Sequence, residues 1–211
     1  MNSRKNSSEL LYDRTNEVKP YLFSKNNAFS KFSQSFNSCI SIWRQSFNLL
    51  KFDKSIFRRV AKMFEEYGYN LVIDFVTNEA EIQKNQDGIV YKIPYNLVAD
   101  TLQRAIFHNV AIWSNKNSLI LFEEPENHSF PPYVRELAMN IIESSSNQFF
   151  IATHSPYLLN TIISEAPRDE VSINVVKFEN YETKIKQLSE DEISEISNYG
   201  IDIFFNLEMF S

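Results

Sequence analysis

The sequence is poor in glycine and cysteine. Only three of its 211 residues are Gly, and none stands in a G-x-x-x-x-G-K-[ST] or G-x-G-x-x-G pattern. These two patterns form the loops that cradle phosphates in many nucleotide-binding proteins. The single cysteine, Cys39, excludes an internal disulfide and an all-cysteine metal site. Any nucleotide chemistry therefore needs a phosphate-binding loop that this sequence does not supply.

The sequence also lacks a long apolar run and an evenly basic surface. No run approaches the roughly 20 apolar residues that span a bilayer, and the polar start is unlike a signal peptide, so we expect a cytoplasmic protein without a membrane partner. Residues 1–50 carry seven Lys or Arg and three Asp or Glu, whereas the whole chain has a net charge of −6. Residues 51–211 are therefore net acidic, which argues against a surface that binds DNA non-specifically.

Residues 1–50 are predicted to be a separate, Asn/Ser-rich and basic segment. We expect residues 1–27 to be loose, with at most a short helix near Leu10 and Leu11. Apolar residues at steps of three and four then predict a helix of about 22 residues from Phe29 to Leu50. Its aromatic stripe either packs on the rest of the chain or belongs to a partner helix or the remnant of a coiled-coil arm.

The next section combines helices with a β-meander. Gly68 is placed to end a helix in the left-handed conformation, and Gly88 lies in a turn between two strands. The predicted elements are a helix over Lys54–Tyr67, strands over Tyr69–Val76, Glu79–Lys84 and Ile89–Ile93, and a helix over Asn96–Trp113. We interpret His108, on the last of these helices, as a structural residue.

From residue 118 the pattern becomes α/β. Two short apolar runs, Ser118–Phe122 and Gln148–Ala152, flank an amphipathic helix over Tyr133–Glu143. Wholly apolar strands are typical of a parallel sheet buried on both faces, and the order strand, helix, strand predicts a parallel crossover. A strand pair over Val171–Phe178 and Lys184–Leu188 and a capped helix after Ser189 complete the chain.

Polar residues follow both apolar strands. The first strand ends in Glu123, Glu124, Pro125 and Glu126, and the second ends in Thr153, His154 and Ser155. Parallel strands deliver these residues to one edge of the sheet, where ligands of such sheets bind. One carboxylate could hold a hydrated Mg²⁺, and the other could orient or deprotonate a water. The alternative is that these charges only solubilise a loop.

The segment from Ser118 to Ile163 resembles the Walker B, D-loop and switch-histidine region of ABC-type ATPases of the AAA-like, RecF-like and OLD-like group. The resemblance rests on an apolar strand, tandem acids and a proline, followed about thirty residues later by an apolar strand ending in T-H-S-P. It implies a P-loop nucleoside triphosphatase fold that hydrolyses Mg²⁺-ATP between two head domains. It assigns Glu123 to the metal, Glu124 to the catalytic base, Asn127 to the D-loop and His154 to the switch position.

Other positions depart from this group. Glu123 stands where Asp is usual, and the signature motif falls at Leu97–Arg104 with Ala99 and Thr101 in place of the expected serine and glycine. Asp100 and Arg104 keep polar capacity there, and with Asn127 and Ser155 they are the predicted nucleotide contacts. The resemblance covers only the second half of a head, about residues 51–190, so we assign 51–211 to this half domain. Residues 1–50 fall where the group carries a helical insertion.

The sequence therefore supports two hypotheses. The first is an ATP-hydrolysing component that obtains its P-loop from a partner chain, a second copy or a missing N-terminal part. Such a component would serve DNA repair or bacteriophage defence, would reach DNA only through the full assembly, and would be inactive as an isolated chain. The second is a non-hydrolysing interaction subunit, or a degenerate fragment, that pairs with an intact ATPase.

Overall fold

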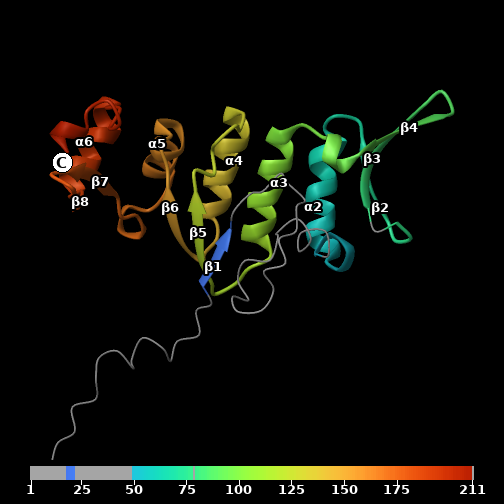
Figure 1. Ribbon diagram of the computed structural model, residues 1–211, viewed down its shortest axis with the longest axis horizontal. Helices are drawn as coiled ribbons and strands as arrows, with labels where there is room; N and C mark the ends of the chain where they lie inside the picture. The colour runs from blue at the N-terminus through green and yellow to red at the C-terminus, as the bar shows by residue number, and fades with distance from the viewer. Residues whose placement is uncertain (1–17, 22–48, 78, 211) are drawn as a thin grey trace, which may run out of the picture.

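A computed structural model describes residues 18–21, 49–77 and 79–210. Its elements follow one another along the long axis of the molecule, from the β2–β4 sheet at one end to α6 and the β7–β8 pair at the other (Figure 1). The fold is mixed α/β, with parallel strands, a crossover helix and antiparallel hairpins. This confirms the predicted fold class.

The central sheet is parallel throughout. Its order is β1 (Val18–Tyr21), β5 (Leu119–Glu123), β6 (Gln148–Ala152), and both pairings are parallel. Helix α4 (Pro131–Ile142) connects β5 to β6 and forms the predicted crossover. The prediction that residues 1–27 are loose is wrong for Val18–Tyr21, which form a strand. A strand of four residues that contains Pro20 gives little periodic signal in the sequence, and its pairing with β5 is what makes it a strand.

Helices α3 (Asp100–Trp113) and α4 cover one face of this sheet. The apolar residues packed between them are Ala111, Ile112, Ile120, Phe122, Leu137 and Ile141. On the other face Leu119 and Leu121 are half-buried, and Phe150 is 56% exposed. The prediction of strands buried on both faces is thus wrong within the described residues, since their second face has no complete cover there.

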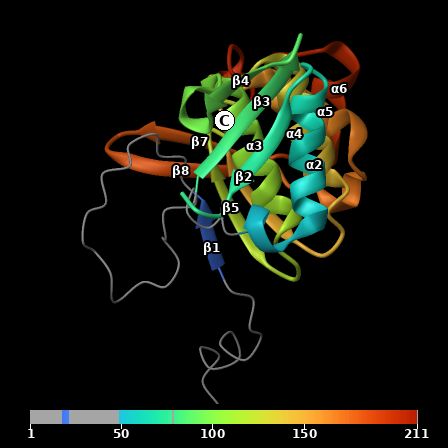
Figure 2. The same cartoon turned by 90° about the vertical axis from the view of Figure 1, so that its right-hand side faces the viewer.

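The second sheet is an antiparallel meander beside α2 (Lys54–Glu65). It consists of β2 (Asn70–Asp74), β3 (Glu79–Gln86) and β4 (Ile89–Pro94), and Figure 2 shows α2 lying alongside β2 and β3. Asp53 caps α2 by accepting from the backbone N–H groups of Ser55 and Ile56. Gly68 has φ +75° just after the helix, as predicted.

Helix α3 begins later than predicted. A 3₁₀ turn over Tyr95–Leu97 and an extended Val98 precede it, so the helix starts at Asp100 rather than Asn96. A chain of side-chain hydrogen bonds joins α3 to α4: Trp113 donates to Asn140, Asn140 to Asn109, and Asn109 to Glu136, each at 3.1 Å. This half-buried chain of hydrogen bonds helps to fix how the two helices face each other.

The C-terminal part forms its own apolar cluster. Helix α5 (Pro156–Glu165), which the sequence analysis did not predict, leads through a 3₁₀ turn to β7 (Asn174–Glu179) and β8 (Glu182–Gln187). Helix α6 (Glu190–Tyr199) and a 3₁₀ turn over Leu207–Met209 follow. The buried residues of this cluster are Ile163, Ile173, Val175, Leu188, Ile193, Ile196, Ile203 and Phe210.

The capping box of α6 is present as predicted. The Ser189 hydroxyl accepts from the Glu192 backbone N–H, and the Glu192 carboxylate accepts from the Ser189 N–H at 2.8 Å. The carboxylate also accepts from the Lys186 ammonium and from the Ser189 hydroxyl, both at 2.9 Å. The Ser189 N–H and these two donors lower the pKa of Glu192 to about 2. We expect Ser189→Ala to lower the free energy of unfolding by about 1 kcal/mol, measured by urea denaturation; an unchanged midpoint would contradict this.

Two predictions fall outside the described residues. Nearly all of the aromatic helix predicted over 29–50 and the short helix near Leu10 lie there; Leu49 and Leu50 are described and are helical. The division of the chain at residue 50 stays a prediction, although β1 from the first part pairs with β5 from the second. Within the described part of the chain, no helix is long and apolar enough to span a membrane.

Candidate functional site

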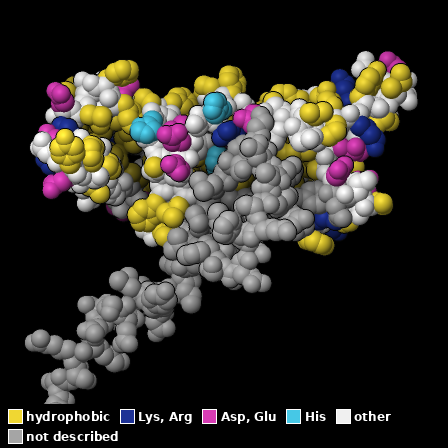
Figure 3. Space-filling view, in the orientation of Figure 1, with side chains coloured by type: hydrophobic (Ala, Val, Ile, Leu, Met, Phe, Trp, Pro, Cys, Tyr) yellow, Lys and Arg dark blue, Asp and Glu magenta, His cyan; other side chains and the backbone are white. Residues whose placement is uncertain are grey.

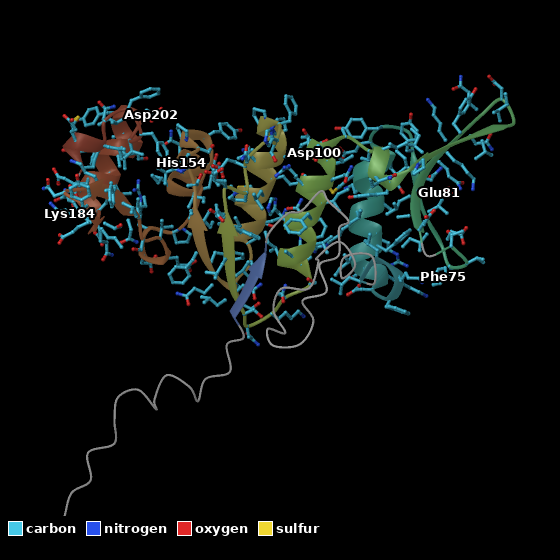
Figure 4. All side chains as sticks on the ribbon, in the orientation of Figure 1. Phe75, Glu81, Asp100, His154, Lys184 and Asp202 are labelled. Atoms are coloured by element: carbon cyan, nitrogen blue, oxygen red, sulfur yellow. The ribbon has the colours of Figure 1, made fainter. Side chains whose placement is uncertain are left out.

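The site lies at the carboxyl ends of β5 and β6. Because these strands pair in parallel, with Glu123 opposite Ala152, the residues that follow them meet at one edge. The Glu124 Oε1 and His154 Nε2 atoms are 3.5 Å apart. His154 is labelled in Figure 4 near the start of α5. The predicted meeting of a carboxylate and an imidazole at this edge is therefore what the structure contains.

Glu124 adopts an unusual backbone conformation. Its φ is +42°, in the left-handed region that non-glycine residues seldom enter, and its N–H donates to the Ala152 carbonyl at 2.8 Å. The Asn127 amide donates to the other carboxylate oxygen, Oε2, at 3.2 Å. Left-handed backbone at a non-glycine residue costs about 1–2 kcal/mol, and strain of this kind concentrates at functional sites.

Glu123 has a different environment from its neighbour. Phe122 before it is buried beneath α3 and α4, whereas Glu123 is exposed at the end of the strand. Among the described residues no group of three or more His, Cys, Asp or Glu side chains could hold a metal. A single exposed carboxylate still fits Mg²⁺, which binds proteins through one or two carboxylates and takes its other ligands from water and phosphate.

Glu126 connects the two strand ends. Its Oε1 accepts from the Thr153 hydroxyl at 2.6 Å and from the His154 backbone N–H at 3.1 Å. Its Oε2 is buried without a hydrogen-bond partner among the described residues. Pro125, just before it, is fully buried. In the sequence Glu126 is only a third acid after the strand, because no spacing rule shows that its carboxylate reaches across to the next strand.

Ser155 and the His154 ring have further contacts. The Ser155 hydroxyl accepts from the Leu158 N–H at 3.2 Å and so caps α5, a structural role. The His154 side chain is 79% exposed. Its ring lies 6.3 Å, centroid to centroid, from that of Phe204, which follows α6. The prediction of Ser155 as a nucleotide contact stays a prediction.

Asp100 and Arg104 lie in the first turns of α3. They form an ion pair of 3.0 Å, and Thr101 between them donates to the His128 carbonyl at 3.0 Å. The first turn of α3 thus contacts the loop that follows Glu126. Figure 3 shows histidine and acidic side chains gathered on the upper middle of this face. The assignment of Asp100, Arg104 and Asn127 to a nucleotide stays a prediction.

The chain belongs to a family of AAA domains. Residues 6–160, well over half of the chain, match a family model whose description reads AAA domain and names an AbiEii toxin and a Type IV TA system. The matched range contains β1, β5, β6 and every site residue described above. The chain is therefore an AAA-type, ATPase-like domain of the P-loop class of folds, although its sequence contains no P-loop pattern. No curated protein matches the sequence significantly.

Three solved structures show a distant likeness. One is from work on ATP-driven dimerization and DNA-stimulated activation of SMC ATPases, with 17% identity, a TM-score of 0.47, and cover of 74% of this chain and 92% of that one. Another is the Smc head bound to the C-winged helix domain of ScpA, with 17% identity and a TM-score of 0.47. The match covers 68% of this chain and 45% of that one.

The third is the Smc head with an extended coiled coil bound to the C-terminal domain of ScpA, from Pyrococcus furiosus. It has 16% identity, a TM-score of 0.45, and cover of 74% of this chain and 40% of that one. The chain thus spans less than half the length of the second and third structures. TM-scores this low do not by themselves establish a shared fold.

Proposed function

We propose that this chain supplies the catalytic edge of an ATPase whose phosphate-binding loop comes from elsewhere. The observation that carries the proposal is the 3.5 Å approach of Glu124 Oε1 to His154 Nε2 across two adjacent parallel strands. Membership of an AAA domain family supports ATP as the ligand. The sequence-level resemblance to OLD-like and RecF-like ATPases belongs to the same proposal.

Each residue then has a distinct role. Glu124 accepts the proton of the water that attacks the γ-phosphate, while Asn127 holds its second oxygen in place. His154 donates a hydrogen bond to the phosphoryl group being transferred. Glu123, exposed beside them, is the carboxylate that would hold Mg²⁺, and Mg²⁺ would neutralise phosphate charge. Asp100 and Arg104, at the start of α3, are the residues that would contact the nucleotide there.

The free edge of β6 supports the need for a complement. Among the described strands β6 pairs only with β5, so its outer N–H and C=O groups are open to another strand. A strand added there in parallel would end at the same edge as Glu124 and His154. A phosphate-binding loop after that strand would then face both residues.

ATP hydrolysis after complementation tests the proposal. The complement is a P-loop-bearing chain, sought first as an adjacent reading frame that encodes a strand followed by G-x-x-x-x-G-K-[ST]. We expect the purified chain alone to hydrolyse ATP only at background, and the mixture to gain activity that depends on Mg²⁺. Robust hydrolysis by the chain alone, or none with a competent complement, would contradict the proposal.

A specific observation favours a second candidate, a non-hydrolysing partner of an intact ATPase. Ala99 and Thr101 stand where the resemblance expects a serine and a glycine, and the Thr101 hydroxyl is engaged with the His128 carbonyl. A complex that forms without any gain in hydrolysis would select this candidate. Under either candidate, the setting we propose is DNA repair or bacteriophage defence, and the toxin–antitoxin wording of the family description accords with defence.

A further inference from the structure

We infer that Glu126 is a positioning residue that holds His154 against Glu124, an inference that rests on the proposed function. One carboxylate oxygen of Glu126, Oε1, accepts two hydrogen bonds from the neighbouring strand end. One of them comes from the His154 backbone itself. Glu126 therefore fixes the main chain from which the imidazole extends, without contacting the reacting atoms.

The contacts make this coupling specific. The Thr153 hydroxyl, which donates to Glu126, also accepts from the Ser155 N–H at 3.0 Å. Thr153, His154 and Ser155 are thus all tied, directly or through one atom, to a single carboxylate oxygen. Hydrogen bonds to a charged acceptor are roughly twice as strong as neutral ones. The 3.5 Å distance between Glu124 and His154 depends on how the ends of β5 and β6 are placed relative to each other. The bonds to Glu126 join these two strand ends and so hold that placement.

The exposure of the His154 ring shows why such a link is needed. The side chain is 79% exposed, so packing alone does little to restrict it, and the ring of Phe204 is tilted by 55° to it. Glu126, in contrast, follows the fully buried Pro125. The chain therefore holds an exposed functional group through its backbone, by means of a residue whose own backbone is anchored in the core.

Amide hydrogen exchange of His154, followed by NMR on the full chain, tests the inference without ATP. In Glu126→Ala we expect the His154 amide to exchange about 10- to 100-fold faster than in the wild type, as for loss of a bond to a charged acceptor. Glu126→Gln, whose amide oxygen can accept the same two bonds without the charge, should exchange faster than the wild type but more slowly than Glu126→Ala. The matched control is Glu195→Ala, which removes an exposed carboxylate on α6.

A loss of thermal stability in Glu126→Ala without faster exchange at His154 would overturn the inference, since it would mark a merely structural role. If Glu126→Ala fails to fold, Thr153→Val is measured in its place. This variant removes one of the two donors, so exchange at His154 should accelerate by severalfold, and an unchanged rate would overturn the inference.

Kinetics of the complemented enzyme provide the second readout. Because Glu126 holds the Thr153–His154 strand end and is not among the proposed nucleotide contacts, its loss should lower kcat by about tenfold or more and leave KM within about threefold. An unchanged kcat would overturn the inference. If even the wild-type chain never gains hydrolysis from a complement, the proposed function fails, while amide exchange at His154 still decides whether Glu126 positions that residue.

Discussion

Replacing Glu124 by Gln is expected to reduce hydrolysis by the complemented ATPase about 10²- to 10⁴-fold. Gln is nearly isosteric with Glu, and its amide group can still form hydrogen bonds with Asn127 and His154. It cannot take a proton from the attacking water. ATP binding should therefore persist while turnover stops, so the variant should retain nucleotide in a stable complex with the P-loop-bearing partner.

The matched control for this variant is Glu195→Gln. Glu195 is an exposed acid on α6, far along the chain from the site, so its neutralisation changes the net charge by the same amount without touching the reaction. Steady-state phosphate release and nucleotide binding are measured for both variants. Full turnover in Glu124→Gln would show that another group accepts the proton, and equal losses in both variants would show a nonspecific charge effect.

A second large effect is expected on acid stability, through His108. The side chain is 5% exposed and lies edge-on to the rings of Phe107 and Phe122. Burial, together with the charge of Arg104 and against a hydrogen bond with the Arg104 backbone that raises it, lowers the pKa of His108 from 6.5 to about 3. His108 is thus neutral in the folded chain and protonated in the unfolded chain between these two pH values.

The direction of the pH dependence follows from this difference. Above pH 6.5 His108 is neutral in both states and the full stability is present. As the pH falls from 6.5 toward 3, only the unfolded state gains the proton, so the free energy of unfolding drops by up to about 1.4 kcal/mol per pH unit. The part of the drop that is due to His108 should disappear in His108→Phe.

Urea denaturation at a series of pH values checks this prediction. The quantity compared is the difference in unfolding free energy between the wild type and His108→Phe, which cancels the titration of other groups. A constant difference between wild type and His108→Phe from pH 7 to pH 4 would contradict the buried, neutral state of His108.

Much of the fold could be predicted because local signals agree with tertiary packing. The runs at Ser118–Phe122 and Gln148–Ala152 combine apolar composition with polar ends, and both are strands of a parallel pair. The Ser189 capping box likewise has all its information within four residues. Strand β1 lacked such a signal, since its pairing partner β5 lies about 100 residues away in the sequence.

The candidate site could be predicted in its residues but not in its geometry. Strand ends in a parallel sheet meet at one edge, which brings Glu124 and His154 together without further information. The left-handed backbone at Glu124 and the two bonds to Glu126 depend on how the loop packs around Pro125, and no spacing rule contains them. Helix α5 was not predicted, since the Ser and Pro of T-H-S-P belong to that motif and are also the N-cap and first residue of the helix.

The most direct test is a structure of the complemented assembly with Mg²⁺-ADP and a planar phosphoryl analogue. We expect the analogue at the carboxyl ends of β5 and β6, with a water between it and the Glu124 carboxylate and with the His154 imidazole on one of its oxygens. An analogue bound away from this edge, with Glu124 and His154 contacting neither water nor phosphoryl group, would contradict a catalytic role for the pair.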